Sequence, residues 1–226
     1  EKIPIIIVGG AMCVLVLIEP NLSITICIAL LLFTYLIAGG LKTKYILMFC
    51  GLGLLMLPIL IIVEPYRLLR LFAFLDPWAS PKGEGYQLIQ SLYSIANGGL
   101  FGVGYLNSRQ ALRFLPFSES DFIFPIIAEE FGLFGCVIVL ACFFEIILIG
   151  FRKAFYADNL FSSYIAFGIS TLIAIQTVIN IAVVSGAIPP TGLPLPLISS
   201  GNTQIIMFLS ELGILINISK HKVGTI

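Results

Sequence analysis

The chain has 226 residues, of which 59% are hydrophobic and only 11% are charged. Soluble domains contain roughly 45–50% apolar residues and about 25% charged residues, so a water-soluble globule is excluded. The mean hydropathy of +1.08 also excludes a disordered chain, because disorder requires low hydrophobicity and high charge. The composition therefore predicts a polytopic membrane protein.

Charge and metal-ligating residues exclude further classes of function. Twelve Lys and Arg residues balance twelve Asp and Glu residues, so we expect no nucleic-acid partner. The five cysteines all lie in apolar runs and form no Cys-x-x-Cys pair, which indicates packing rather than disulfides or metal binding. His221 is the one histidine. A histidine-based catalytic triad or a multi-histidine zinc site is therefore not expected, and we predict no metal ligands.

Continuous apolar runs predict an all-α membrane helix bundle, because a membrane helix needs about 20 mostly apolar residues. Glu19-Pro20-Asn21 interrupts the first of these runs. The interruption is either a tight turn between two spans or a break within a discontinuous pair. We interpret the chain as a single membrane domain, 1–226, with a long outer loop at 64–121. Its predicted spans are residues 3–18, 22–39, 45–63, 131–151, 160–186 and 203–219.

Positive residues predict the orientation of the spans, because short cytoplasmic loops are rich in Lys and Arg. The basic pairs that include Lys42 and Arg152 lie between predicted spans on one side, and the short turns on the other side hold no Lys or Arg. This arrangement predicts that both ends of the chain are cytoplasmic. Residues 64–121 and 185–202 would then lie on the outer face.

The outer loop is where chemistry is expected, and two of its stretches predict interfacial helices. Tyr66–Phe74 carries arginines on one side and leucines and phenylalanines on the other. Gly85–Ala96 carries the polar residues Tyr86 and Gln87, which are candidates for substrate binding. Helices that lie with one apolar face in lipid suit a substrate that is part lipid and part polar headgroup.

A glycine-rich run follows at residues 98–104. No Lys-Ser/Thr follows it, as a phosphate-binding Walker loop requires, and no strand–turn–helix unit surrounds it, as a dinucleotide fingerprint requires. Two interpretations stay open. The run is either a flexible re-entrant turn or a loop whose backbone approaches a pyrophosphate.

Asp121 is the candidate catalytic residue. One interpretation is structural, with Ser120 capping a helix that starts at Asp121. The other is chemical, because a carboxylate at the water–membrane boundary is suited to abstract a proton from a sugar hydroxyl. Arg109 and Arg113 would hold a departing diphosphate, and Glu119 is a further candidate for substrate binding.

Polar residues within the predicted spans leave alternatives open. Carboxylates inside a membrane are costly and are functional by default, so Glu145 is either a proton relay or the partner of a single hydrogen bond to another helix. Glu211 is the second intramembrane carboxylate. Neither span contains several such groups, which weakens a proton-coupled transporter hypothesis. Gln176 and Asn180 are more typical of residues that bridge helices than of substrate ligands.

A proline-rich segment at 185–203 is strongly apolar although its prolines and glycines preclude a helix. Such a segment between spans must be buried in protein or line a cavity. Ser199 and Thr203 belong to a polar run that opens the last predicted span. Their free amides and hydroxyls either bind an anion or cap the helix.

Together these motifs resemble the SEDS family of shape, elongation, division and sporulation proteins, which includes FtsW, RodA and SpoVE. Their order and spacing agree along nearly the whole chain, and Trp78 after Asp-Pro is typical of the FtsW/SpoVE branch. The matching pieces are Pro20-Asn21-Leu22-Ser23, Leu75-Asp76-Pro77-Trp78, Gly85-Tyr86-Gln87, Gln90-Ser91, Gly98-Gly99-Leu100-Phe101-Gly102, Asp121-Phe122-Ile123-Phe124, Glu129-Glu130-Phe131-Gly132, Asn180-Ile181, Gly186, Pro189, Thr191-Gly192 and Leu195-Pro196-Leu197-Ile198-Ser199.

The resemblance implies a fold, an activity and partners. The family has ten spans, of which this chain corresponds to the last six, and the start at Glu1 without methionine agrees with missing N-terminal spans. The family polymerises lipid II outside the bacterial cytoplasmic membrane and is paired with a class B penicillin-binding transpeptidase. Its essential aspartate corresponds to Asp121, with Ser120 in the place of a threonine.

We therefore predict a peptidoglycan glycosyltransferase of cell division or sporulation, in which Asp121 acts as the general base. The diphosphate would be held by arginines or by a divalent cation such as Mg²⁺ or Mn²⁺. One alternative is a flippase for the lipid-linked precursor. The other is a non-catalytic scaffold for the transpeptidase, which Ala111 and Phe117 favour because they stand where the family has lysine and glutamate.

Overall fold

The computed structural model describes residues 3–116 and 118–220, and the described chain is helical and contains no strand. This confirms the predicted all-α membrane fold. Close contacts group these residues into two compact units. The first unit contains the described residues up to Ile89 together with Ile188–Pro190, and the second contains Gln90–Ala187 together with the described residues from Thr191 onward. Phe117 and His221 lie outside the described residues.

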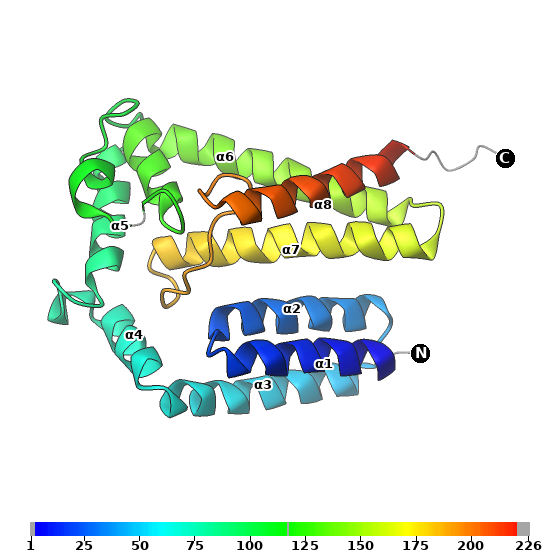
Figure 1. Ribbon diagram of the computed structural model, residues 1–226. Coiled ribbons are helices and arrows are strands. Elements are labelled where there is room, and N and C mark those ends of the chain that lie inside the picture. Colours follow the sequence, from blue (N-terminus) through cyan, green and yellow to red (C-terminus); the bar gives the residue numbers. More distant parts are fainter. Residues whose placement is uncertain (1–2, 117, 221–226) are drawn as a thin grey trace. The chain divides into compact units, whose positions relative to one another are not determined.

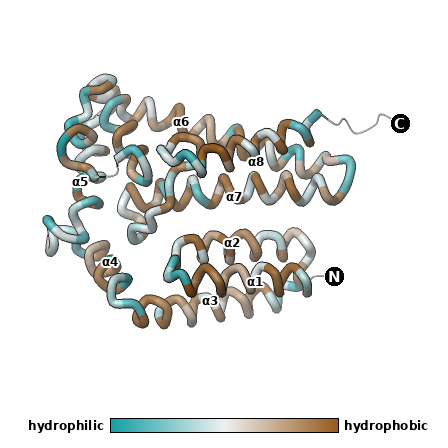
Figure 2. Tube along the Cα trace, viewed as in Figure 1, coloured by the Kyte–Doolittle hydropathy of each residue, from teal (hydrophilic) through white to brown (hydrophobic). Residues whose placement is uncertain are grey.

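The helices follow one another as labelled in Figure 1. Four of them, α3, α6, α7 and α8, are long and apolar enough to cross a membrane, and α1 and α2 are shorter apolar helices. Brown, hydrophobic residues accordingly run along α3, α6 and α7 in Figure 2. The elements are α1 (Ile3–Ile18), α2 (Leu22–Ala38), α3 (Thr43–Val63), α4 (Pro65–Leu75), η1 (Pro77–Ala79), α5 (Tyr86–Gly98), η2 (Gln110–Phe114), α6 (Ile123–Phe155), α7 (Leu160–Val184) and α8 (Asn202–Lys220).

In the first unit, α1 and α2 pack against each other as separate helices joined by a short turn. Asn21 begins α2, because its side-chain oxygen accepts a hydrogen bond from the Ile24 amide at 3.1 Å. A side chain at Gly9 would lie 2.8 Å from Leu32, so this glycine lets the two helices approach closely. Of the two interpretations of the Pro20 interruption, the structure therefore has the tight turn.

Arg67 fixes the corner between α3 and α4. Its side chain is 8% exposed, and Nη1 donates to the Leu60 carbonyl of α3 at 2.6 Å while Nη2 donates to the Pro20 carbonyl at 3.2 Å. The Tyr66 hydroxyl donates to the same Pro20 carbonyl at 2.7 Å. The predicted helix at 66–74 is confirmed as α4, and Phe72 is exposed on its apolar side.

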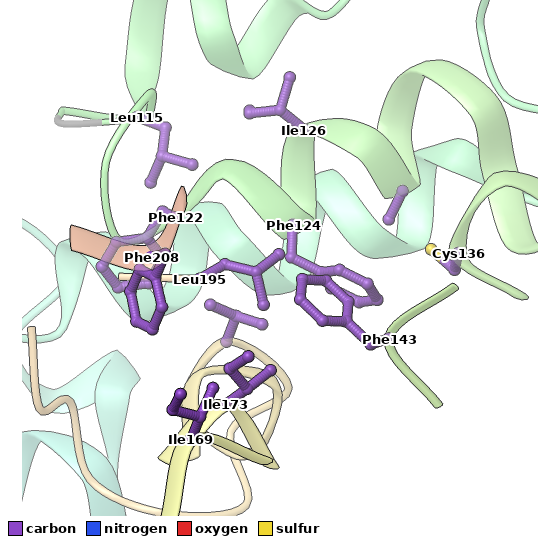
Figure 3. Close-up of a cluster of buried hydrophobic side chains, with 12 residues drawn as sticks. Leu115, Phe122, Phe124, Ile126, Cys136, Phe143, Ile169, Ile173, Leu195 and Phe208 are labelled. Carbon is purple, nitrogen blue, oxygen red and sulfur yellow. The ribbon is translucent and has the colours of Figure 1, made fainter. Parts of the chain in front are cut away.

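In the second unit, α6 packs along α7 and both contact α8. The core between them also receives Leu195 from the non-helical segment, which is 1% exposed. Leu193, Pro196 and Ser199 are buried as well, so the middle of the apolar segment is buried in protein, which is one of the two settings that its composition predicts. Figure 3 shows side chains of this core from the three helices, from that segment and from the stretch ahead of α6; they include Leu115, Phe122, Phe124, Ile126, Cys136, Phe143, Ile169, Ile173, Leu195 and Phe208.

Helix α6 begins at Ile123, eight residues before the predicted span at 131–151, and it is interrupted at Gly132. Gly132 has φ 65° and ψ −163°, which no helical residue adopts. We call this the α6 break. An interruption deprives the residues around it of their helical hydrogen bonds, and in a membrane protein those polar groups need other partners.

The partners come from residues 98–104, which we call the glycine loop. Two of its carbonyls accept the amides that follow the break, and two of its amides donate to the carbonyls that precede the break. The four bonds are Leu133 N to Gly99 O at 2.9 Å, Phe134 N to Leu100 O at 3.2 Å, Val103 N to Glu129 O at 2.9 Å and Gly104 N to Glu130 O at 3.0 Å. The glycine loop thus replaces the missing rungs of the helix.

This arrangement explains why the loop is rich in glycine. A Cβ on Gly102 would collide with the Glu130 carbonyl, and one on Gly98 would collide with the Ala128 carbonyl. The amides of Gly102, Val103 and Gly104 all donate to backbone carbonyls. They are therefore engaged within the protein rather than free for a pyrophosphate.

Candidate functional site

Asp121 lies two residues ahead of α6 and does not cap it. The N-cap residue of the helix is Phe122, which makes no side-chain capping bond. The Asp121 carboxylate instead accepts a hydrogen bond from the Ser120 hydroxyl at 2.8 Å, and the side chain is partly exposed. The structural interpretation, in which Ser120 caps a helix that starts at Asp121, is therefore wrong.

The backbone around Asp121 is held from two directions. Asn180 of α7, which is 1% exposed, donates from Nδ2 to the Asp121 carbonyl and to the Leu193 carbonyl, each at 2.8 Å. The Ser200 amide donates to the Glu119 carbonyl at 2.7 Å. A side chain built at Gly192 would come within 3.9 Å of the Asp121 carboxylate. Asn180 thus bridges a helix and two loops, and it places Asp121 beside the proline-rich segment.

Arg109 is the N-cap residue of a single π-helical turn, η2, and Arg113 lies within that turn. The turn is anchored by Leu115, which is buried in the core and whose amide donates to the Gln110 carbonyl at 2.8 Å. Both arginine side chains are exposed. Within residues 3–116 and 118–220, neither arginine has a hydrogen-bond or ion-pair partner. Their guanidinium groups are therefore free to bind an anion in the fork geometry that suits phosphate.

The other predicted binding residues have diverse surroundings. Glu119 is exposed, and Thr203 is exposed in the first turn of α8. Ser199 is 2% exposed, and its hydroxyl accepts the Leu195 amide at 2.8 Å, which closes the turn that it belongs to. Tyr86 and Gln87 are half-buried at the start of α5, in the first unit. Their roles toward a substrate stay predictions.

Comparison with known proteins assigns the family. Residues 2–224 match the model of the cell cycle protein family FtsW/RodA/SpoVE. The chain belongs to this family. The resemblance drawn from the sequence motifs is thereby confirmed, and the chain is an integral membrane protein.

Individual relatives agree with this assignment. The chain is 39% identical over 209 residues to stage V sporulation protein E of Bacillus subtilis, covering 92% of this chain and 57% of that protein. It is 40% identical over 223 residues to a probable peptidoglycan glycosyltransferase FtsW of Coxiella burnetii, covering 96% and 59%. The chain thus spans less than two thirds of the length of these relatives.

A solved structure gives the same result at the level of the fold. It is described as "Structural coordination of polymerization and crosslinking by a peptidoglycan synthase complex". The match has a TM-score of 0.77 with 27% sequence identity, and it covers 96% of this chain and 61% of the solved chain. The chain is therefore similar in fold to one component of a peptidoglycan synthase.

The two carboxylates inside the predicted spans have few partners. Glu145 is exposed on α6, and Glu211 is half-buried on α8 with a buried Oε2 atom that has no hydrogen-bond partner in the described chain. In the same residues, no three His, Cys, Asp or Glu side chains gather as a metal site would need. The basic residues nearest in sequence to Asp121 are Arg109 and Arg113.

Sequence reasoning missed Glu129, the most completely buried carboxylate of the second unit, at 1% exposure. Its side chain accepts hydrogen bonds from Ser94 and Ser108, which lie far from it in sequence. The signal in the sequence was the pair Glu129-Glu130 at the start of an apolar run. A buried carboxylate is costly unless hydrogen-bond donors surround it, but the spacing of residues in the sequence does not identify those donors.

Proposed function

We propose that the intact protein is a peptidoglycan glycosyltransferase that polymerises lipid II at the outer face of the bacterial cytoplasmic membrane. One observation carries the proposal. Asp121 presents a partly exposed carboxylate whose hydrogen-bond partner is Ser120, while Asn180 holds its backbone. A carboxylate that is fixed in position but has few hydrogen bonds is suited to accept a proton from a substrate. The family and the names of the relatives support the same activity.

The proposed reaction inverts the configuration at the anomeric carbon. Asp121 accepts the proton of the 4-hydroxyl of the acceptor sugar, and the hydroxyl oxygen attacks the anomeric carbon of a polyprenyl-diphosphate-linked donor. A carbon–oxygen bond forms on one face of the sugar while the bond to the diphosphate breaks on the other. Arg109 and Arg113 bind the diphosphate of the donor and hold it equally as it leaves.

The proposed partner is a class B penicillin-binding transpeptidase, which would cross-link the strands. The relative in a peptidoglycan synthase complex supports this pairing.

We also propose that both ends of the chain are cytoplasmic, as the basic residues near Lys42 and Arg152 indicate. Cysteines placed at Lys42 and at Lys82 should then be labelled from opposite sides of the membrane. Labelling from the same side would contradict this orientation.

Asp121→Asn tests the catalytic assignment. Asparagine has nearly the same shape, but its amide cannot accept the proton, so we expect polymerisation of labelled lipid II to fall by about 10²–10⁴-fold. The thermal midpoint should stay at the parent value, because Asp121 does not cap α6. The assay uses the intact protein with its transpeptidase.

The outcomes separate the alternatives. Near-parent polymerisation by the Asn variant would remove Asp121 from the reaction. A parent that moves lipid II across vesicles without polymerising it would be a flippase. A parent that does neither would be a scaffold, and the residues at Ala111 and Phe117 would be the first to examine.

A further inference from the structure

A buried carboxylate in the outer part of α6 joins three segments of the second unit. A single oxygen of Glu129, Oε2, accepts hydrogen bonds from the Ser94 hydroxyl at 3.3 Å, from the Ser108 hydroxyl, and from the Gln110 amide at 3.3 Å. Ser94 lies on α5, Ser108 precedes η2, and Gln110 begins η2. Glu129 therefore ties η2 to α5 and α6.

The bonds continue from Glu129 into the turn itself. The Ser108 hydroxyl that donates to Glu129 also accepts the Ala111 amide at 3.0 Å. Two consecutive amides at the start of η2, those of Gln110 and Ala111, thus depend on Glu129, one directly and one through Ser108. The backbone of Glu129 adds a further tie, because its carbonyl accepts the Val103 amide of the glycine loop at 2.9 Å.

Stability alone does not explain this choice of residue. Burial of a carboxylate is costly even when hydrogen bonds surround it, and a well-packed apolar residue often gives a more stable protein. What a carboxylate adds is a stronger hold on its donors, because charge-assisted hydrogen bonds are shorter and roughly twice as strong as neutral ones. The residues on either side of these amides are Arg109 and Arg113, whose guanidinium groups have no hydrogen-bond or ion-pair partner among the described residues.

We propose that Glu129 is a positioning residue that holds η2 so that Arg109 and Arg113 meet the donor diphosphate. It acts through the backbone of residues 108–111 and does not touch the substrate. The inference rests on the proposed function, since it assigns to η2 the recognition of a polyprenyl diphosphate. Without Glu129 the turn would still fold, but it would sample many orientations.

The first arm of the test needs no activity. Glu129→Gln keeps the shape and an acceptor oxygen but removes the charge, so amide hydrogen exchange in residues 108–115 of the intact protein should become roughly tenfold faster. The matched control is Glu130→Gln. Glu130 is the adjacent carboxylate, 9% exposed, and its side chain makes no hydrogen bond in the described part of the chain. Exchange in residues 108–115 should stay at the parent rate in that control.

The second arm measures donor kinetics. Glu129→Gln should raise the KM for lipid II about tenfold and change kcat by less than about twofold, because binding of the diphosphate is weakened while Asp121 is untouched. The Arg109→Ala/Arg113→Ala variant should raise the KM at least as much. Adding Glu129→Gln to that variant should cause no further loss, since both arginines through which Glu129 acts are already removed.

Three results would overturn the inference. Parent-like exchange in Glu129→Gln would mean that Glu129 does not hold η2, whatever the activity. A further loss when Glu129→Gln is added to the Arg109→Ala/Arg113→Ala variant would mean that Glu129 acts elsewhere. Faster exchange without a change in the KM would mean that η2 does not recognise the donor. Failure of the proposed function is separate, because it would appear as a parent without polymerisation or as an active Asp121→Asn variant.

Discussion

Two interruptions of helical structure flank the candidate site, and they are stabilised in different ways. At the α6 break, the backbone of the glycine loop supplies all four bonds that replace the helical rungs. The second interruption is residues 191–201, the part of the proline-rich segment that we call the proline segment. Side chains bond to its backbone: Asn180 donates to the Leu193 carbonyl and Ser199 accepts the Leu195 amide. One region depends on the absence of side chains and the other on particular polar side chains.

The difference predicts which substitutions each region tolerates. A backbone-to-backbone contact requires close approach, so any added Cβ is harmful even if it is apolar and small. A side-chain contact requires a donor or an acceptor at one atom, so a substitution of equal volume is harmful if it changes that atom. The following variants test this comparison, from the largest expected effect to the smallest.

The α6 break should be intolerant of alanine. In Gly132→Ala, the methyl group meets the backbone of Leu100 and Gly102 at a residue whose φ is 65°. We expect a loss of about 4 kcal/mol or more in unfolding free energy, read as a large drop in the thermal midpoint in detergent. Gly51→Ala in α3 is the control, because nothing lies within 4 Å of its added Cβ. A parent-like midpoint for Gly132→Ala would show that α6 can straighten.

The proline segment should instead respond to the exchange of a single group in Asn180→Asp. The new carboxylate has the same size but faces the carbonyls of Asp121 and Leu193, to which the amide donated. Two lost bonds and a buried charge should cost about 2–4 kcal/mol. Polymerisation should fall further than the folded fraction does, because Asp121 loses its support. If the midpoint and the polymerisation both match the parent, Asn180 does not hold Asp121.

The smallest effect is expected for Ser199→Ala. The change leaves the buried Leu195 amide without its acceptor, which should cost about 1–2 kcal/mol in unfolding free energy. The midpoint in detergent measures this loss. Polymerisation per folded molecule then decides the second question about this residue, since a loss beyond the change in stability would assign anion binding to its hydroxyl. An unchanged midpoint would contradict the structural account of the segment.

The helices of the second unit were predictable where the apolar run alone defines them. Helix α7 was predicted at 160–186 and runs over Leu160–Val184, because its apolar run continues without a break over its whole length. The start of α6 at Ile123 was not predictable in the same way. Glu129 and Glu130 read as the polar edge of a span. Both are buried, and the donors that compensate the burial of Glu129 are hydroxyls more than twenty residues away in the chain.

The site was predictable in its residues but not in their relations. The position of Asp121 between a basic stretch and an apolar run indicated its chemistry. Its support by Asn180 depends on a contact between residues 59 positions apart, which no local pattern encodes. Likewise, the glycine loop could be recognised as a loop from its composition, while its role at Gly132 follows only from the pairing of two distant segments.

The corner at Arg67 has a consequence for which residues its position can accept. Its guanidinium joins the turn after α1, the end of α3 and the start of α4. The guanidinium is planar and rigid, so two of its nitrogens hold the carbonyls of Leu60 and Pro20 in a fixed geometry. A lysine has a single nitrogen on a flexible stem and cannot take both places. The direction in which α4 leaves α3 therefore depends on the shape of this cation and not on its charge alone.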